Sequence, residues 1–492
     1  MVKIMIKDNK ILLGKAEEKD IYVYPSMLNR HGLIAGATGT GKTITLKVLA
    51  ESMSQLGIAT VIADVKADLT GMIQEGDLSV IQERLNSMGI EAFPVQKYPV
   101  HFFDVFQKKG HPVRASIQEM GPRLFARALE LTEAQEGVLT IIFKAAEDME
   151  LDIIDIKDLQ AMVQYVSEHS AELSGKYGNI ARATTGVIQR KVLKLEQEGG
   201  DIFFGMPALN IQDWITTEGG LGMMNILECE ELFQHPLLYA VFLNWMLEEL
   251  YTTLPEVGDT EKPKVVFFFD EAHLLFDGAS KEFLRNIERT VKLIRSKGVG
   301  VFFITQNPAD IPDSVLAQLG NRIQHALRAY TPTEIRAVKL AADSFRANPA
   351  FDTSEQITQL KTGQALVSVL DSEGTPSVVE VTKILPPQSK MGILEDTIVQ
   401  QYISSDSIYG KYENAFDPDS AYEEMERILD AEEKEKEAAI EEAQKAKEKA
   451  RITKQKDQWA GRLQRKAVNK VENELVNMGV RSAKKFLKGF IK

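Results

Sequence analysis

The chain has 492 residues, 44% of them hydrophobic and 26% charged, which is ordinary for a folded globular protein. This composition excludes a disordered chain, a collagen and a disulfide scaffold, and the single cysteine, Cys229, cannot form an internal disulfide. The sequence has neither a signal-peptide core nor an apolar run near the roughly 20 residues that a membrane span needs. We therefore expect a cytoplasmic protein without an integral membrane segment.

The formal net charge of -13 conceals an asymmetry, because residues 451–492 carry 12 Lys and Arg against 3 Asp and Glu. The rest of the chain is strongly acidic, which argues against a polyanion-binding surface over the whole body. Any contact with nucleic acid is therefore expected to be local, in a channel or on this basic tail.

Short β-branched and aromatic runs alternate with helix-like stretches along the chain, which predicts an α/β fold with a mostly parallel central sheet. Several runs are apolar without alternation, as expected for strands that helices cover on both faces. The predicted strands are residues 31–36, 57–65, 99–105, 222–229, 264–273, 299–307, 322–329, 365–370 and 377–385.

Strand signals stop between Gln107 and Asp213, where helical patterns take over. We expect the first part of the core in residues 1–106, a helical insertion in residues 107–213, the second part of the core in residues 214–390 and a helical C-terminal extension with a basic end in residues 391–492. Residues 421–460 contain neither Gly nor Pro and are rich in Glu, Lys and Ala, which predicts a long helix.

The apolar stripe of this long helix is thin, which leaves open whether the helix is solvated or docks a partner. Its basic end is amphipathic and could meet nucleic acid, a protein or a second copy of the chain, or an anionic membrane surface.

The segment GATGTGKT fulfils the phosphate-loop pattern GxxxxGK[ST] and lies between a predicted strand and a predicted helix. Its residues are Gly36, Ala37, Thr38, Gly39, Thr40, Gly41, Lys42 and Thr43. We expect backbone N–H groups to surround the phosphates of ATP, Lys42 to bridge the β- and γ-phosphates, and the Thr43 hydroxyl to hold Mg²⁺.

The apolar strand in KVVFFFDEAHLLF ends in two acids, the second half of such a site. Asp270 is expected to orient Mg²⁺ through a water molecule, and Glu271 to polarise the attacking water, which favours hydrolysis over phosphate transfer to a small molecule. The next strand ends in FFITQN, where Gln306 is expected to sense the γ-phosphate. His273 is left open between a supporting and a functional role.

The run VIADVKADL places Asp64, Lys66 and Asp68 at the carboxyl end of a predicted strand, where open α/β sheets bind ligands. For Lys66 and Asp68, a role in the site and a place in a solvated loop remain equally open.

These segments occur in the order known from one family. RHGLIAGATGTGKT, VIADVKADL, LTEAQ, VVFFFDEAHLLF and GVGVFFITQNPADIPDSVLAQLGNRI resemble the motifs of HerA-like ATPases of the HerA/FtsK superfamily. The resemblance covers about residues 20–390 and is strongest to bacterial helicase HerA-like C-terminal domain proteins. It implies a RecA-like P-loop NTPase core, ATP hydrolysis at subunit interfaces, and typically a homo-oligomer in the form of a hexameric ring that pumps double-stranded DNA.

The resemblance also implies an arginine that acts from the neighbouring subunit. In this family it stands just before the strand that enters the phosphate loop, where this chain has Arg30. Arg295 matches another basic position near the nucleotide, and Arg322 starts the strand after the sensor. For all three, a surface salt bridge is the alternative.

True HerA proteins carry a β-barrel before the phosphate loop, whereas only about 30 residues precede it here. We therefore expect that the barrel is missing, which leaves both ring assembly and a nuclease partnership open.

The leading hypothesis is an ATP-hydrolysing motor, a DNA translocase or helicase-like enzyme. A second hypothesis is an ATP-dependent interaction module that docks a protein or membrane surface through its C-terminal tail. A third hypothesis is a metabolic kinase. Such an enzyme would have a pocket for a small-molecule phosphate acceptor and would not require Glu271.

Overall fold

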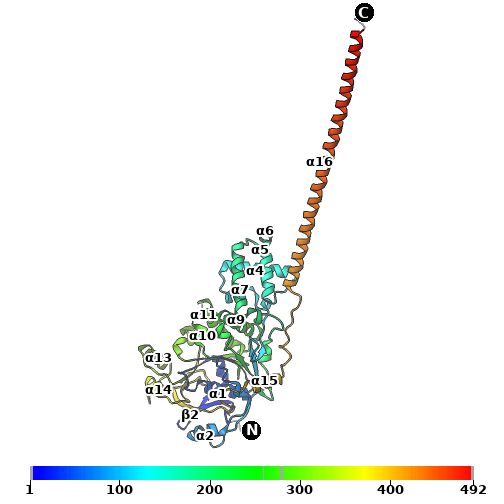
Figure 1. Cartoon of the computed structure of the whole chain (residues 1–492). Helices are drawn as coiled ribbons and strands as arrows, with labels where there is room; N and C mark the ends of the chain where they lie inside the picture. Colours follow the sequence, from blue (N-terminus) through cyan, green and yellow to red (C-terminus); the bar gives the residue numbers. More distant parts are fainter. Residues whose placement is uncertain (1–3, 259, 278–280, 489–492) are drawn as a thin grey trace. The chain divides into compact units, whose positions relative to one another are not determined.

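The computed structural model describes residues 4–258, 260–277 and 281–488, and its contacts divide the chain into two units with the boundary after Tyr422. The predicted fold class is confirmed: the chain has an α/β core with a mostly parallel sheet, helical insertions and a long C-terminal helix. Figure 1 shows the course of the chain.

One mixed 13-stranded sheet forms the centre of the first unit, in the order β1-β2-β15-β14-β13-β4-β12-β11-β5-β10-β6-β7, with β3 also paired to β2. Its strands are β1 (Ile6–Lys7), β2 (Lys10–Ala16), β3 (Lys19–Val23), β4 (Gly32–Ala35), β5 (Ala59–Asp64), β6 (Val100–Asp104), β7 (His111–Pro112), β10 (Met224–Glu228), β11 (Val265–Phe269), β12 (Val299–Thr305), β13 (Asn321–His325), β14 (Gln364–Ser368) and β15 (Glu380–Ile384). A separate hairpin pairs β8 (Thr217–Glu218) with β9 (Leu221–Gly222).

The strands from β13 to β7 in this order run parallel, whereas β14, β15, β2, β1 and β3 pair antiparallel. The apolar runs of β5, β11 and β12 are buried along their whole length because helices cover both faces of the sheet. Phe268 of β11, for example, lies in register with Ile62 of β5 and Phe302 of β12. Parallel strands bring their carboxyl ends to the same edge, and this edge carries the candidate site.

The three N-terminal strands were not among the predicted elements. β1 and β2 are joined by a tight turn in which Asp8 and Asn9 have φ values of 52° and 58°, and β3 follows β2 directly. These short antiparallel strands extend the edge formed by β14 and β15, where β2 pairs with β15.

Helices cover the sheet in the first unit (Figure 1). They are α1 (Lys42–Gln55), α2 (Leu78–Ser87), α9 (Pro236–Thr253), α10 (His273–Phe276), α11 (Lys281–Ile294), α12 (Asp313–Leu316), α13 (Pro332–Asp343), α14 (Thr353–Gln359) and α15 (Asp396–Ser404). Helix α1 is buried over nearly its whole length, because it follows the phosphate loop into the centre of the fold.

The segment between β7 and β8 is helical, and Figure 1 shows its longer helices gathered into a cluster. It contains α3 (Ile117–Ala128), α4 (Glu133–Asp148), α5 (Ile156–Glu168), α6 (Ser170–Tyr177), α7 (Arg182–Leu195) and α8 (Asp201–Phe203). Capping boxes at Thr132 and Asp155 mark where α4 and α5 begin. Helix α7 packs against α4 and α5, while α3 contacts α9 and α11 and so joins the helical cluster to the core.

Residues 391–422, which we grouped with the C-terminal extension, belong to the first unit. Helix α15 buries Val399 and Ile403 in the main core cluster, and the following segment is tied to β6 and β7 through Asp406.

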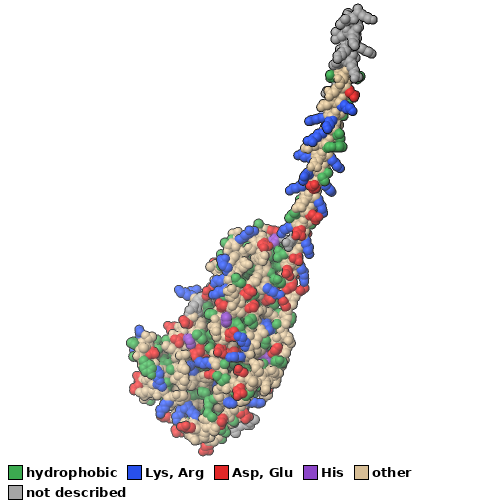
Figure 2. Space-filling view, in the orientation of Figure 1, with side chains coloured by type: hydrophobic (Ala, Val, Ile, Leu, Met, Phe, Trp, Pro, Cys, Tyr) green, Lys and Arg blue, Asp and Glu red, His purple; other side chains and the backbone are tan. Residues whose placement is uncertain are grey.

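The second unit consists of most of α16 (Ala421–Lys488), a helix of 68 residues with mostly exposed side chains. Figure 2 shows Lys and Arg side chains gathered along its later part, up to the grey end. Among the described residues, none of the helices is both long enough and apolar enough to cross a lipid bilayer.

Candidate nucleotide-binding site

The phosphate loop connects the end of β4 to the first residue of α1. Gly36, Gly39 and Gly41 have φ values of 152°, 76° and 114°, which residues other than glycine rarely adopt. A Cβ atom on Gly36 would also lie 2.5 Å from the Cβ atom of His325. The glycines of the motif are therefore required by the shape of the loop.

The neighbouring strands hold this loop in place. The Gly36 amide donates to the Thr305 carbonyl over 3.2 Å, and the Ala37 amide donates to the Ala326 carbonyl over 2.8 Å. Within the loop, Thr40 Oγ1 donates to the Ala37 carbonyl over 2.7 Å. The loop is thus fixed to residues at the ends of β12 and β13.

His325 packs against the phosphate loop and was not identified from the sequence. Its Nδ1 atom lies 3.0 Å from the Gln364 carbonyl oxygen, and its Nε2 atom lies 2.8 Å from Thr45 Oγ1. Burial lowers the pKa of His325 to about 4, so the ring is neutral near pH 7. Because a carbonyl only accepts, Nδ1 carries the proton and Nε2 accepts from Thr45 in the first turns of α1.

Lys42 points back into the loop. Its Nζ atom donates to the carbonyl oxygens of Gly36 and Ala37, over 2.6 and 3.3 Å. Burial lowers the pKa of Lys42, an effect that Glu271 and Asp270 oppose. The ammonium therefore lies where the loop curves, within the electrostatic influence of the two acids that follow β11.

Those acids come directly after the last residue of β11. Burial raises the pKa of Asp270 to about 6, with Glu271 and Asp68 adding like-charge repulsion against the opposing effect of Lys66. Glu271 has a φ of 45°, a backbone conformation that residues other than glycine seldom adopt. The two neighbouring acids are thus held at the edge where the phosphate loop lies.

Glu271 is the centre of a polar cluster. Gln306, the first residue after β12, donates from Nε2 to Glu271 Oε2 over 3.4 Å. The Nδ1 atom of His273 lies 3.4 Å from the same oxygen, which places His273 next to the acid. The structure therefore brings Glu271 and Gln306 together as the sequence predicted, and His273, the first residue of α10, lies next to Glu271.

Lys66 and Asp68, whose roles the sequence left open, both lie at this site. The Lys66 ammonium donates to Glu271 Oε1 and lies 3.9 Å from Asp270 Oδ2. Thr43 Oγ1 donates to Asp68 Oδ2 over 3.4 Å. The loop after β5 therefore reaches both the phosphate loop and the acids after β11.

Thr43, Asp68 and Asp270 supply oxygen atoms, which are the kind of ligand that Mg²⁺ prefers. Burial is the main cause of the raised pKa values of Asp68 and Asp270, and a divalent cation would relieve this cost to the charged carboxylates. In the part of the chain that the structure describes, no group of three or more His, Cys, Asp or Glu forms a dedicated metal cage. Mg²⁺ needs none, since it binds one or two carboxylates together with phosphate oxygens and water.

The three candidate catalytic arginines lie at the amino ends of the parallel strands, opposite the carboxyl ends that carry the phosphate loop. Arg30 precedes β4, Arg295 precedes β12, and Arg322 is the second residue of β13. The Arg322 guanidinium donates to three backbone carbonyls, those of Leu316, Leu319 and Ser344. Arg322 therefore supports the turn after α12, and Arg30 and Arg295 stand at strand starts, away from the phosphate loop of their own chain.

Comparison with known proteins gives distant relatives. Over 369 residues the chain is 22% identical to the DNA double-strand break repair helicase HerA of Saccharolobus solfataricus, covering 74% of this chain and 67% of that protein.

The fold is similar to that of the bacterial conjugative coupling protein TrwBdeltaN70 in its unbound form, with a TM-score of 0.52 and 14% identity over 78% of this chain and 90% of that one. TrwB in complex with the ATP analogue ADPNP matches with a TM-score of 0.50 and 14% identity, over 78% and 91% of the two chains. TrwB is also known in complex with ADP and Mg²⁺, a structure that matches with a TM-score of 0.48 and 14% identity over 74% and 87%.

The family model described as "Helicase HerA-like C-terminal" matches residues 9–490, nearly the whole chain. This protein therefore belongs to the family described as "Helicase HerA-like C-terminal".

Proposed function

We propose that this protein is an ATP-hydrolysing, HerA-like motor that acts on DNA as a translocase or helicase-like enzyme. The observation that carries the proposal is the convergence of the phosphate loop, Asp270, Glu271 and Gln306 at the carboxyl edge of β4, β11 and β12. A phosphate loop alone would serve any nucleotide-binding protein. The added pair of an aimed carboxylate and a polar sensor is what hydrolysis of the γ-phosphate requires.

Each residue then has a distinct role. Lys42 and the loop amides bind the phosphate oxygens of ATP, and Thr43 with Asp270 holds Mg²⁺, which neutralises phosphate charge when bound. Glu271 orients the attacking water and accepts its proton, and Gln306 positions Glu271 through their hydrogen bond. Arg30 of a neighbouring subunit supplies the guanidinium that a loose phosphoryl-transfer transition state favours, with Arg295 and Arg322 as the other candidates.

Two observations support action on DNA by an oligomer. The chain belongs to the HerA-like C-terminal family, and its relative from Saccharolobus solfataricus is named as a DNA double-strand break repair helicase. In addition, Arg30 and the phosphate loop lie at opposite ends of β4, so an arginine in this position can complete only the site of another subunit. A homo-oligomer, such as a hexameric ring, provides that arrangement.

The direct test measures ATP hydrolysis by the purified chain without DNA, with single-stranded DNA and with duplex DNA, together with its mass with and without ATP. We expect Mg²⁺-dependent hydrolysis that DNA stimulates and a mass that rises to an oligomer with ATP. Hydrolysis without any response to either DNA would refute the assignment to DNA while leaving the ATPase in place.

A second candidate is an ATP-dependent interaction module that docks through the tail. It rests on α16, in which Trp459 and Val471 are 67% and 58% exposed and which begins acidic and ends basic. Binding of the full chain to anionic vesicles or to a protein partner, dependent on both ATP and residues 451–492, would favour this candidate over the motor.

A further inference from the structure

Lys66 stands between two groups of carboxylates. On one side its ammonium donates to Glu271 and approaches Asp270. On the other side Lys66 lines a cavity of about 330 Å³ whose wall includes Asp64, Glu228 and Asp396. The Lys66 side chain is 40% exposed, and its contacts with these two acids are made by the terminal ammonium.

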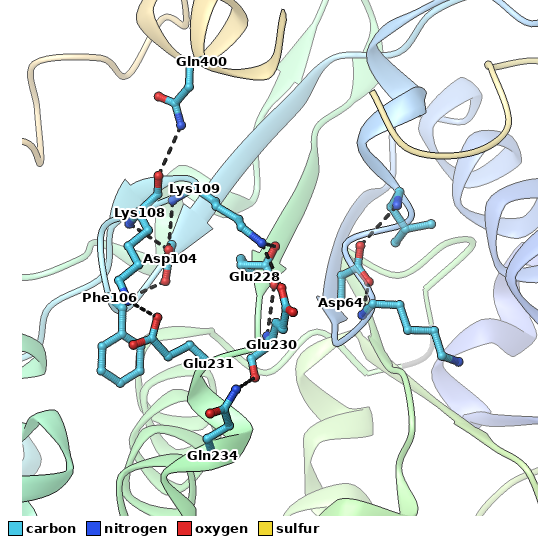
Figure 3. A network of polar contacts seen from close by, with 12 residues as sticks. Asp64, Asp104, Phe106, Lys108, Lys109, Glu228, Glu230, Glu231, Gln234 and Gln400 are labelled. Atoms are coloured by element: carbon cyan, nitrogen blue, oxygen red, sulfur yellow. Dashed lines mark hydrogen bonds and ion pairs between the residues drawn. The ribbon is translucent and has the colours of Figure 1, made fainter. Parts of the chain in front are cut away.

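The cavity lies at the carboxyl ends of β5 and β10, next to the candidate nucleotide site. Its far wall has cations of its own, because Lys109 lies 2.8 Å from Glu230 and 4.0 Å from Glu228. Figure 3 shows this network, with Asp64 on the other side of Glu228 from Lys108 and Lys109. On the side of the cavity nearest Lys66, the carboxylate in the wall is Asp64, which accepts hydrogen bonds from backbone amides.

Asp64 is that carboxylate, and it lies at the base of the Lys66 side chain. The backbone amide of Lys66 donates to Asp64 Oδ1 over 3.0 Å, and the Leu69 amide donates to Asp64 Oδ2 over 3.2 Å. Burial, together with the nearby charge of Asp68, raises the pKa of Asp64 to about 7. A further positive charge next to Asp64 would be favourable. Buried Lys47 already contributes one charge in this region, and Lys66, whose own amide binds this carboxylate, is a second cation with a partly exposed side chain.

From this geometry, and on the basis of the proposed ATPase function, we propose that Lys66 is a movable internal cation. It holds the acids after β11 when no divalent cation is bound there, and it turns toward Asp64 and the acidic cavity when one binds. Lys66 is thus a positioning residue, which keeps Glu271 engaged as a salt-bridge partner until the metal arrives.

Electrostatics gives the reason for the exchange. Two positive charges within a few ångström of Asp270 repel each other, and partial burial of the site weakens solvent screening of that repulsion. While Lys66 donates to Glu271, this acid is a poorer base, because a carboxylate that accepts from an ammonium is stabilised in its charged form. A rotation of the Lys66 side chain toward Asp64 would remove both the repulsion of the metal ion and the lowered basicity of Glu271.

The test measures binding of Mn²⁺, a paramagnetic substitute for Mg²⁺, to the full chain in the absence of nucleotide by electron paramagnetic resonance. In Lys66→Met we expect the dissociation constant for Mn²⁺ to fall by roughly tenfold, because the competing ammonium is gone. Lys66→Arg retains the cation and should stay within about threefold of the wild type. Lys176→Met, which removes an exposed lysine that pairs with Asp148 in the helical insertion, is the matched control for loss of one charge.

Asp64→Asn supplies the opposite change, since it removes the charge that receives Lys66 but keeps a side-chain oxygen for the amides. We expect weaker Mn²⁺ binding in Asp64→Asn, and a smaller effect of the same substitution when Lys66→Met is already present. Equal effects in both backgrounds would overturn the exchange, as would unchanged or weaker Mn²⁺ binding in Lys66→Met. Lys66→Gln provides the same measurement if Lys66→Met does not fold.

The two proposals fail differently. Mn²⁺ binding is measured without turnover, so a chain that never hydrolyses ATP refutes the proposed function and leaves the Mn²⁺ comparison valid. Conversely, normal hydrolysis with no change of Mn²⁺ affinity in Lys66→Met refutes only the exchange of Lys66.

Discussion

The Nε2 atom of His111 lies 3.0 Å from the Oδ2 atom of Asp406, and its Nδ1 atom lies 2.5 Å from Glu413 Oε1. Ionised carboxylates only accept hydrogen bonds, so the buried ring carries both protons and a positive charge. Burial alone would lower the pKa of His111, but the hydrogen bonds with Asp406 and Glu413 outweigh this effect and raise it. The Nδ1 atom of His101 lies 2.7 Å from the same Asp406 oxygen, and the Tyr409 ring packs against the His111 ring.

We predict that this cluster makes the segment after α15 sensitive to alkaline pH. A histidine whose pKa is raised in the folded chain contributes stability that is fully present below its ordinary value near 6.5 and is lost as the pH rises through the raised value. Wild type should therefore exceed His111→Gln in free energy of unfolding by about 1–3 kcal/mol at pH 6, and by less at pH 9. Denaturant unfolding at both values measures this, and a difference that does not depend on pH would contradict it.

The second prediction separates binding from hydrolysis. Lys42→Ala removes the ammonium that lies in the phosphate loop, so ATP binding and all nucleotide-dependent activity should be lost. Glu271→Gln keeps the shape of the side chain but removes its basicity, so ATP should still bind while turnover falls by roughly a hundredfold or more. Fluorescent-nucleotide titration and steady-state hydrolysis measure the two effects. Normal turnover in Glu271→Gln would disprove its role as the base.

The third prediction concerns the arginine from a neighbouring subunit. Arg30→Ala and Lys42→Ala should each be inactive alone, since removing a guanidinium from such a transition state costs roughly 10³- to 10⁵-fold in rate. Mixed assemblies should regain part of the activity, at interfaces where an intact Lys42 meets an intact Arg30. Hydrolysis is measured across mixing ratios, and normal hydrolysis by Arg30→Ala alone would contradict this prediction.

The fourth prediction addresses the basic tail. If residues 451–492 bind nucleic acid through phosphates, their deletion should weaken DNA binding and flatten its salt dependence. Each lost phosphate contact removes roughly 0.7 to 0.9 from the slope of log affinity against log salt concentration. Fluorescence anisotropy over a series of salt concentrations gives the slope. A slope that the deletion leaves unchanged would instead favour docking of the tail to a protein or a membrane surface.

The sequence predicted those parts of the fold that depend on local pattern. Fully apolar runs such as the one around Phe268 identify central strands, and the glycines of the phosphate loop fix its conformation wherever it lies. The place of Glu271 and Gln306 followed as well, because Glu271 is the second residue after β11 and Gln306 is the first residue after β12.

The remainder depends on tertiary contacts that no local pattern encodes. Strands β1 and β3 pair with β2, and β2 in turn pairs with β15, more than 350 residues away in sequence. His325 supports the phosphate loop only because β13 lies next to β4. Likewise, Lys66 becomes a neighbour of Glu271 through the pairing of β5 with β11, so the sequence could not decide between a site and a solvated loop.

Strand β4 has a further consequence, because it separates Arg30 from the phosphate loop by four residues of extended chain, a span of about 13 Å. If the arginine of one copy completes the site of the next, turnover per chain is not a fixed property of the molecule but a function of how many copies meet. Dilution would then act as an inhibitor, and crowding on a shared DNA molecule as an activator, without any change in the affinity of a single chain for ATP.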